Sequence, residues 1–314
     1  MSPPPSMIRN SSNKHQHLGS VSWASLPKEL VELIAWRVLA GDLLDYVRFR
    51  AVCTHWNSST VPPHGRGLID RRFHPRRWML FPEGHGLYPG HPNLGGYVRF
   101  FNLSTAAFVR VHLPLFDDHV VLDSVDGILL LLRHPDTATR LLHPFTGEIA
   151  ELPPLSSLVP QLDSKALRRM TNDKKLRKMG NFLIGLCAAV TVSVAGVITI
   201  MVTPDMIQVH RVAYAAAGDQ RWALSDWKLP RLLTSTVSFQ GKLYALSLKS
   251  ESSHQNDDDD KVYIYRVDPP QSNAKGSSHT LSLPPPVLIA ECPLLEAIGA
   301  VHLVECDSEL MLVG

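Results

Sequence analysis

The sequence has little net charge, few aromatic residues and few cysteines, and these shortages exclude several classes of protein. Lys and Arg total 31 against 29 Asp and Glu, so the formal net charge is only +2, too small for a protein that lives on a nucleic-acid backbone. Aromatic residues make up 7% of the chain. The spacing of the cysteines fits neither a zinc site nor a compact disulfide framework: Cys53, Cys187, Cys292 and Cys306. We therefore expect no nucleic-acid partner, no metal and a reducing compartment.

The common catalytic and targeting motifs are also missing. G-x-S-x-G, H-E-x-x-H, C-x-x-C and G-x-x-x-x-G-K-[ST] do not occur, so nucleophile, zinc and phosphate-loop chemistry have no anchor. Residues 1–22 are rich in Ser, Pro, Asn and His and lack the apolar core of a secretory signal. We expect a disordered leader there, no cofactor, and no enzyme. Four histidines among Gly and Pro are typical of an exposed loop: His64, His74, His85 and His91.

Helical periodicity is clearest in residues 23–62. An apolar stripe recurs there every four residues, at Leu26, Leu30, Ile34 and Val38. Gly41 provides a helix stop and Asp42 an N-cap, which predicts a first helix over about residues 27–39 and a second helical stretch after it. About forty residues of helix bury little surface alone, so this unit needs a neighbour.

The order of landmarks in these helices identifies a family. Leu-Pro stands at 26–27, Asp-Leu-Leu at 42–44 and Val-Cys-x-x-Trp at 52–56, and the segment resembles the F-box, the adaptor-binding module of cullin-based ubiquitin ligases. In that family three helices bury an apolar face against a Skp-type adaptor. The resemblance implies the following adaptor-binding residues, some of which must instead hold the helices together: Leu26, Pro27, Leu30, Ile34, Leu43, Val52, Cys53 and Trp56.

The remainder of the chain has the pattern of many short strands. Short apolar runs alternate with Gly, Pro, Asp and Asn clusters from about residue 72 onward. Four strand–turn–strand segments close on a Leu-Pro pair, with Leu at 113, 152, 229 and 283, in steps of 39, 77 and 54 residues. A second kind of hairpin interleaves with them, at 125–130, 239–244 and 305–311. Two hairpins per unit of this length predict a β-propeller in preference to a β-sandwich.

Sequence within these repeats also resembles a known family. Residues 142–154, Gly218-Asp219-x-x-Trp222 and residues 241–245 are similar to blades of the KIB-type, kelch-like propeller that follows an F-box in plant proteins. His143 stands where that family often has Asn. The expected fold class is α+β by domain: a small three-helix F-box at 23–62, a connector at 63–95, and a mainly-β propeller at 96–314. The sequence ends inside a strand element, whereas the resembled propellers continue for further blades, so we expect an incomplete, truncated propeller.

Three segments have alternative interpretations. Residues 182–203 carry no charge over 22 positions and follow a basic flank, as a membrane helix would, but 11 of the 22 are Val, Ile or Thr and Ala195-Gly196 divides them like a hairpin turn. We expect two buried strands. The basic stretch 165–178 is either a nuclear-import patch or, as we expect, a solvated insertion between blades. The acidic run 257–260 lacks the spacing of a calcium loop and suits a hairpin tip.

The resemblance implies a non-catalytic function. The chain is expected to be the substrate-recognition subunit of a cullin-based, SCF-type E3 ubiquitin ligase in the cytoplasm or nucleus. Its expected partners are a Skp-type adaptor, through it a cullin, and a target protein that the sequence does not identify. The alternatives are a membrane-anchored protein spanning once at 182–203, which carbonate extraction would reveal, and an orphan kelch-like enzyme, whose activity would survive loss of the helices.

Overall fold

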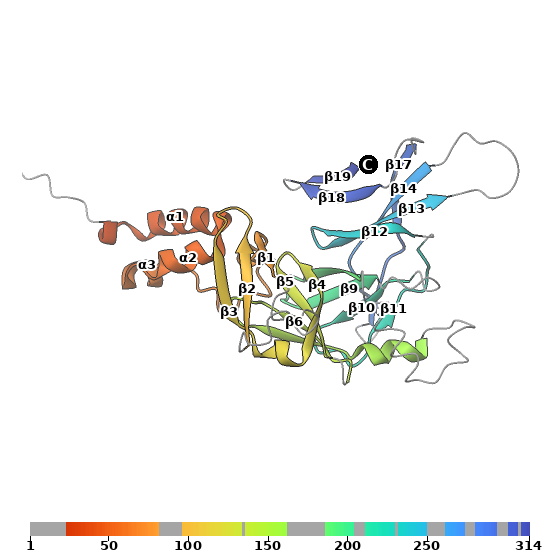
Figure 1. Ribbon diagram of the computed structural model, residues 1–314, viewed down its shortest axis with the longest axis horizontal. Coiled ribbons are helices and arrows are strands. Elements are labelled where there is room, and N and C mark those ends of the chain that lie inside the picture. Colours follow the sequence, from red (N-terminus) through yellow and green to blue (C-terminus); the bar gives the residue numbers. More distant parts are fainter. Residues whose placement is uncertain are drawn as a thin grey trace, which may run out of the picture. The chain divides into compact units, whose positions relative to one another are not determined.

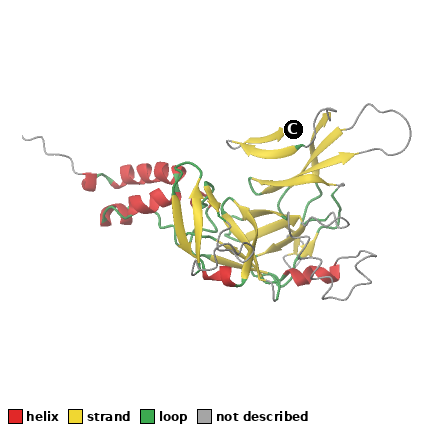
Figure 2. Cartoon of the chain, viewed as in Figure 1, coloured by secondary structure: helices red, strands yellow, loops and turns green. Residues whose placement is uncertain are grey.

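The computed structural model divides the chain into two compact units, residues 1–62 and 63–314. It describes residues 23–81, 96–133, 136–161, 186–203, 211–229, 232–249, 261–273, 280–293, 301–306 and 309–314 (Figures 1 and 2). The leader, the basic stretch 165–178 and the acidic run 257–260 lie outside these ranges.

The described part of the first unit is helical. It consists of a short 3-10 segment η1 (Trp23–Ser25) and the helices α1 (Lys28–Gly41), α2 (Leu43–Arg50) and α3 (Thr54–Ser58) (Figure 1). Asp42 separates the first two helices, and its carboxylate accepts the backbone N–H of Leu44 at 2.8 Å. The predicted stop and N-cap are therefore confirmed, although α1 continues to Gly41, two residues beyond the expected end.

The second unit is built mainly of antiparallel sheets that follow one another along the chain (Figure 2). The first sheet has three strands: β1 (Trp78–Leu80), β2 (Tyr97–Asn102) and β3 (Phe108–His112). The second sheet has four: β4 (His119–Val125), β5 (Ile128–Arg133), β6 (Thr139–Leu142) and β7 (Ile149–Leu152). The third also has four: β8 (Cys187–Val192), β9 (Ile198–Thr203), β10 (Ala213–Ala216) and β11 (Ala223–Leu224).

Later strands form a further four-stranded sheet and two hairpins. The sheet contains β12 (Leu232–Phe239), β13 (Lys242–Lys249), β14 (Lys261–Val267) and β17 (Val287–Pro293). The hairpins pair β15 (Gln271–Asn273) with β16 (Thr280–Ser282), and β18 (His302–Cys306) with β19 (Glu309–Val313). Short 3-10 segments connect other elements: η2 (Arg71–Phe73), η3 (Pro114–Asp117) and η4 (Leu155–Gln161).

Consecutive sheets pack against each other through apolar faces. One buried cluster joins β4–β7 to β8–β11, a second joins β8–β11 to β13 and β14, and a third joins β13 and β14 to β18. The first strands of successive sheets are neighbours: β4 lies beside β8, β8 beside β12, and β12 beside β18. Four-stranded sheets stacked in this way, each presenting its first strand to the next, are the arrangement of propeller blades.

The uncharged segment that resembled a membrane helix is a hairpin. Strand β8 pairs with β9, and the turn between them contains Ala195 and Gly196 as expected. Every residue of β9 is buried, because Ile198, Ile200 and Val202 face the preceding blade while Met201 faces the following one. A strand covered on both faces needs a continuous apolar run. The membrane-helix alternative at 182–203 is thus wrong for the described residues 187–203, and no described helix has the length and apolarity needed to cross a bilayer.

The hairpins predicted at 125–130 and 239–244 are confirmed, each with a two-residue turn. Asp126 and Gly127 join β4 to β5, with φ angles of 53° and 85°, and Gln240 and Gly241 join β12 to β13, with 51° and 76°. Two consecutive positive φ angles define the type I′ turn, whose twist suits a two-residue hairpin. Glycine is required at 127 for a second reason, because a Cβ there would lie 2.4 Å from the carbonyl oxygen of Pro75.

One predicted hairpin is wrong. The fourth Leu-Pro segment placed β14 beside a strand ending at Leu283, but β14 pairs with β17 instead. The strand before Leu283 is β16, which pairs with β15, and Leu283 itself packs with the cluster between the third blade and the β12–β14 sheet. The other Leu-Pro pairs follow the pattern, because Leu113 succeeds β3, Leu152 ends β7 and Leu229 lies beyond β11.

Part of the expected connector belongs to the second unit. Phe73 and His74 are buried, and β1 is hydrogen-bonded to β2, so residues 63–81 are not a free linker. His74 is therefore not in an exposed loop as expected. It lies beside the carboxylate of Asp126, which also accepts a hydrogen bond from Arg71 at 2.8 Å. Burial alone would raise the pKa of Asp126, but the neighbouring His74, Arg71 and Arg76 side chains outweigh it and hold that pKa well below its usual range.

Candidate functional site

One face of α1 packs into the interior of the helical unit. Val31, Ala35 and Leu39 are buried, spaced every four residues along that helix, and Leu43 and Tyr46 of α2 are buried as well. The Tyr46 hydroxyl donates to the carbonyl of Val61 at 2.7 Å, which ties the end of the unit to α2. These side chains leave the opposite face of α1 without a role in the interior.

That opposite face carries exposed apolar residues. Leu30 is 46% exposed and Leu33 is 51% exposed, and a spacing of three residues makes them neighbours on the helix surface. Val47 of α2 and Val52 after it are also exposed, the latter at 62%. An apolar side chain left in water contributes nothing to the stability of the free unit but up to about 1.5–3 kcal/mol when a partner covers it. These positions therefore suit docking.

The α3 helix is held by the landmark residues at 53–56. Cys53 is the N-cap of α3, where its Sγ accepts the backbone N–H of Trp56 at 3.5 Å. The Trp56 ring stacks on Phe49 with a centroid distance of 4.3 Å, and its indole N–H donates to the carbonyl of Trp23 at 3.2 Å. His55 is hydrogen-bonded to the carbonyl of Leu26 at 2.8 Å. The start of the unit and α2 are thus both fastened to α3.

The structure separates the expected adaptor-binding residues into two groups. Leu43 is buried, while Cys53 and Trp56 are half-buried and make contacts within the unit. Pro27, Leu30 and Val52 are exposed, and Leu26 and Ile34 are half-buried. The first group supports the three-helix arrangement, and the second is accessible to a partner.

Sequence reasoning missed the true interior stripe of α1. The stripe at 26, 30, 34 and 38 lies one residue away from the buried one at 31, 35 and 39. Ala35 is small and only weakly apolar, so it was not recognised as an interior residue. Its spacing of four residues from both Val31 and Leu39 is the signal that could have identified it. Leu33 and Val47 were also missed as accessible apolar residues.

No cluster suited to metal binding is found in the parts of the chain that the structure describes. His143, one of the buried histidines, makes structural hydrogen bonds: its Nε2 lies 3.0 Å from the carbonyl of Phe73, and its Nδ1 accepts the backbone N–H of Thr146 at 3.0 Å. Trp222 is also structural, because its buried indole donates to the carbonyl of Pro153 in the preceding blade at 2.7 Å.

Successive four-stranded antiparallel sheets that follow a separate helical unit in the chain define a β-propeller protein with an N-terminal helical module. The chain belongs to the KIB1-4 beta-propeller family, whose model matches residues 100–314. A probable F-box protein of Arabidopsis thaliana is 36% identical to it over 102 residues. That match covers 30% of this chain and 24% of the relative, so the chain spans about a quarter of the relative's length.

Proposed function

We propose that this protein is the substrate-recognition subunit of an SCF-type ubiquitin ligase in the cytoplasm or nucleus. Residues 23–62 dock a Skp-type adaptor and through it a cullin, and the propeller holds a target protein. The observation that carries the proposal is the exposed apolar face of α1, at Leu30 and Leu33, on a three-helix unit with F-box landmarks. Membership of a propeller family and similarity to a probable F-box protein support it.

The proposed mechanism is proximity. A receptor that holds adaptor and target on one chain converts the meeting of target and charged ubiquitin carrier into an intramolecular event, which raises the effective concentration without any catalytic side chain. Cys53 forms no thioester in this mechanism, because ubiquitin passes from the charged carrier to the held target without a covalent intermediate on the receptor. No described feature favours the orphan-enzyme alternative.

The test is capture of a recombinant Skp-type adaptor by the full chain. Leu30→Ala removes an exposed side chain and introduces the residue with the best helix propensity, so the helix should persist while adaptor binding falls at least about tenfold. The matched control is Glu29→Ala, an exposed polar residue one position earlier on the same helix, which should bind like wild type.

Trp56→Ala serves as a different kind of control. It removes the stacking on Phe49 and the bond to Trp23, so we expect lower helicity together with weaker capture. Circular dichroism distinguishes this loss of structure from a loss of contact. Undiminished capture by both Leu30→Ala and Val52→Ala would contradict the proposed docking face.

A further inference from the structure

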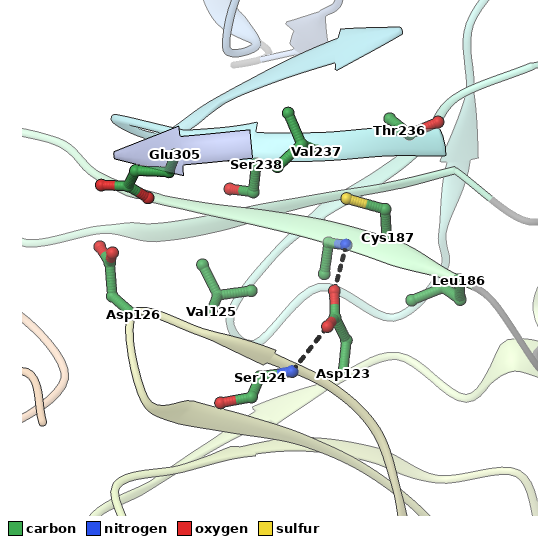
Figure 3. Close-up of a pocket in the computed structure, with 11 residues that line it drawn as sticks. Asp123, Ser124, Val125, Asp126, Leu186, Cys187, Thr236, Val237, Ser238 and Glu305 are labelled. Atoms are coloured by element: carbon green, nitrogen blue, oxygen red, sulfur yellow. Dashed lines mark hydrogen bonds between the residues drawn. The ribbon is translucent and has the colours of Figure 1, made fainter. Parts of the chain in front are cut away.

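The second unit contains a cavity of about 310 Å³ where the first strands of four successive sheets meet. Strands β4, β8, β12 and β18 each contribute to its wall, and Figure 3 shows Asp126 and Glu305 toward one end, with Asp123 and Cys187 toward the other. A volume near 300 Å³ is at the lower end of the range for ligand sites in proteins.

The described residues of the cavity wall carry negative charge and no positive charge. Its carboxylates are Asp123, Asp126 and Glu305, its hydroxyls come from Ser124, Thr236 and Ser238, and none of its residues is Lys, Arg or His. Burial, followed by the nearby Asp123 charge, raises the pKa of the Cys187 thiol to about 12, so that thiol is neutral. Val125, Leu186 and Val237 complete the wall with apolar surface.

The three carboxylates differ in how far their charge is compensated. Asp126 is paired with Arg71 and Arg76 at 2.8 and 3.6 Å. Among the described residues, Asp123 accepts backbone N–H groups alone, from Ala188 at 2.7 Å to one oxygen and from Ser124 at 2.7 Å to the other. Burial raises its pKa, and these two bonds oppose the shift only in part. The Glu305 side chain is exposed, and no hydrogen bond or ion pair joins its carboxylate to another described residue.

We propose that this cavity receives the ammonium group of a lysine side chain from the target protein. The proposal rests on the proposed function and supplies part of its recognition step. Among the described residues, Asp123 and Glu305 have no cationic partner and so favour a cation, and Val125, Leu186 and Val237 can pack against an alkyl stem. Each oxygen of Asp123 already accepts one N–H, which leaves single acceptor positions. The ammonium of lysine has three rotatable donors and can bond to one remaining acceptor position of Asp123. The planar guanidinium of arginine prefers to bond to both oxygens of a carboxylate at once.

This assignment has a regulatory consequence. Acetylation of the bound lysine would remove its charge, so an acetylated target would escape recognition. The same chemistry provides a matched pair of probes. Nα-acetyl-lysine N-methylamide presents the charged side chain, and its Nε-acetylated form presents the same backbone without the charge.

The test is calorimetric titration of the full chain with the two probes. We expect the charged probe to bind at least tenfold more tightly than the acetylated one. Glu305→Gln should weaken binding of the charged probe severalfold, whereas Glu309→Gln, an exposed residue on the adjoining strand that does not line the cavity, should leave it unchanged. Asp123→Asn should weaken it as well, and if that variant fails to fold, Glu305→Gln decides.

Several outcomes would overturn the inference. Equal affinity for the two probes, or wild-type affinity in Glu305→Gln, would remove the cation site. Binding of free 1,5-diaminopentane tenfold tighter than the lysine probe would assign the cavity to a small amine in place of a target side chain. These titrations need no adaptor, so a failure here with intact adaptor capture rejects the cavity assignment alone, and the reverse result rejects the proposed function alone.

Discussion

His143 illustrates how a departure from a family pattern can be accommodated by a single residue. In the resembled blade an Asn often occupies this position, and here the Nδ1 of the imidazole accepts the backbone N–H of Thr146 as an Asn side-chain oxygen would. The imidazole also reaches further, because its Nε2–H donates to the carbonyl of Phe73 at 3.0 Å. The residue thereby fixes the β6–β7 turn and holds η2 against it.

The pH dependence of His143 follows from this geometry. Burial lowers its pKa below the ordinary value of 6.5, with the bond to Phe73 opposing and the nearby His74 reinforcing the shift. A histidine with a lowered folded-state pKa contributes stability above its unfolded-state pKa and loses it as the pH falls through the region below 6.5. A protonated Nδ1 would also face the Thr146 N–H with a second donor.

We predict that His143→Asn lowers the free energy of unfolding at pH 7.5 by about 1–2 kcal/mol, because the Phe73 carbonyl loses its donor. The difference from wild type should narrow between pH 7.5 and pH 5.5, since only wild type carries the buried titrating group. Urea unfolding at the two pH values, followed by near-UV circular dichroism, measures this. His64→Asn changes an exposed histidine and is the control. A pH-independent difference would show that His143 is not held neutral.

At the scale of the elements, sequence predicted the local structures and failed at the longer-range pairings. The hairpins at 125–130 and 239–244 were found because each has a polar residue and a glycine between two short apolar runs, a signal that lies within six adjacent residues. The partner of β14 was not found, because β17 follows an intervening hairpin and its pairing depends on contacts that adjacent residues do not record. The continuous apolar run of β9 was ambiguous for a related reason, because burial by two neighbouring blades looks the same as burial in lipid.

Two glycines in one sheet separate two reasons why a turn needs glycine: a positive φ angle and the lack of space for a Cβ. Gly127 in the β4–β5 turn and Gly147 in the β6–β7 turn both have positive φ angles, 85° and 72°. A Cβ at 147 meets nothing within 4 Å, whereas one at 127 meets the Pro75 carbonyl oxygen at 2.4 Å. Alanine at 147 would add backbone strain alone, whereas alanine at 127 would add the same strain and a collision with the backbone of Pro75, before β1.

We predict that Gly147→Ala costs about 1–2 kcal/mol of unfolding free energy, the typical penalty for a left-handed non-glycine residue. Gly127→Ala should cost about 1–3 kcal/mol more, because the Pro75 backbone must move. Urea unfolding of both variants at pH 7.5 gives the two values. Equal costs would mean that the segment before β1 yields without resistance and does not brace the turn.

For the whole molecule, the sequence supplied the division into helical module and propeller but not the location of a site. The landmarks at 26–27, 42–44 and 52–56 each consist of adjacent residues, so they can be recognised from the sequence alone. The cavity is different, because its walls come from residues at 123–126, 186–188, 236–238 and 305, which only the packing of successive blades brings together. The interior face of α1 was also misassigned, since the choice between adjacent stripes depends on how α2 packs.

The two units should respond separately to substitutions in the intact chain. Asp126→Asn removes the charge that Arg71 and Arg76 neutralise, while Asn at the first position of a type I′ turn preserves the hairpin. Because those arginines are partly exposed, we expect this substitution to lower the free energy of unfolding of the second unit by only about 1–2 kcal/mol. Leu30→Ala should leave that transition unchanged and lower adaptor capture, whereas Asp126→Asn should leave capture unchanged at 20 °C. Urea unfolding followed by near-UV circular dichroism measures the stability, and co-precipitation with the adaptor from the same samples measures the capture. Reduced capture by folded Asp126→Asn would mean that the propeller contributes to adaptor docking.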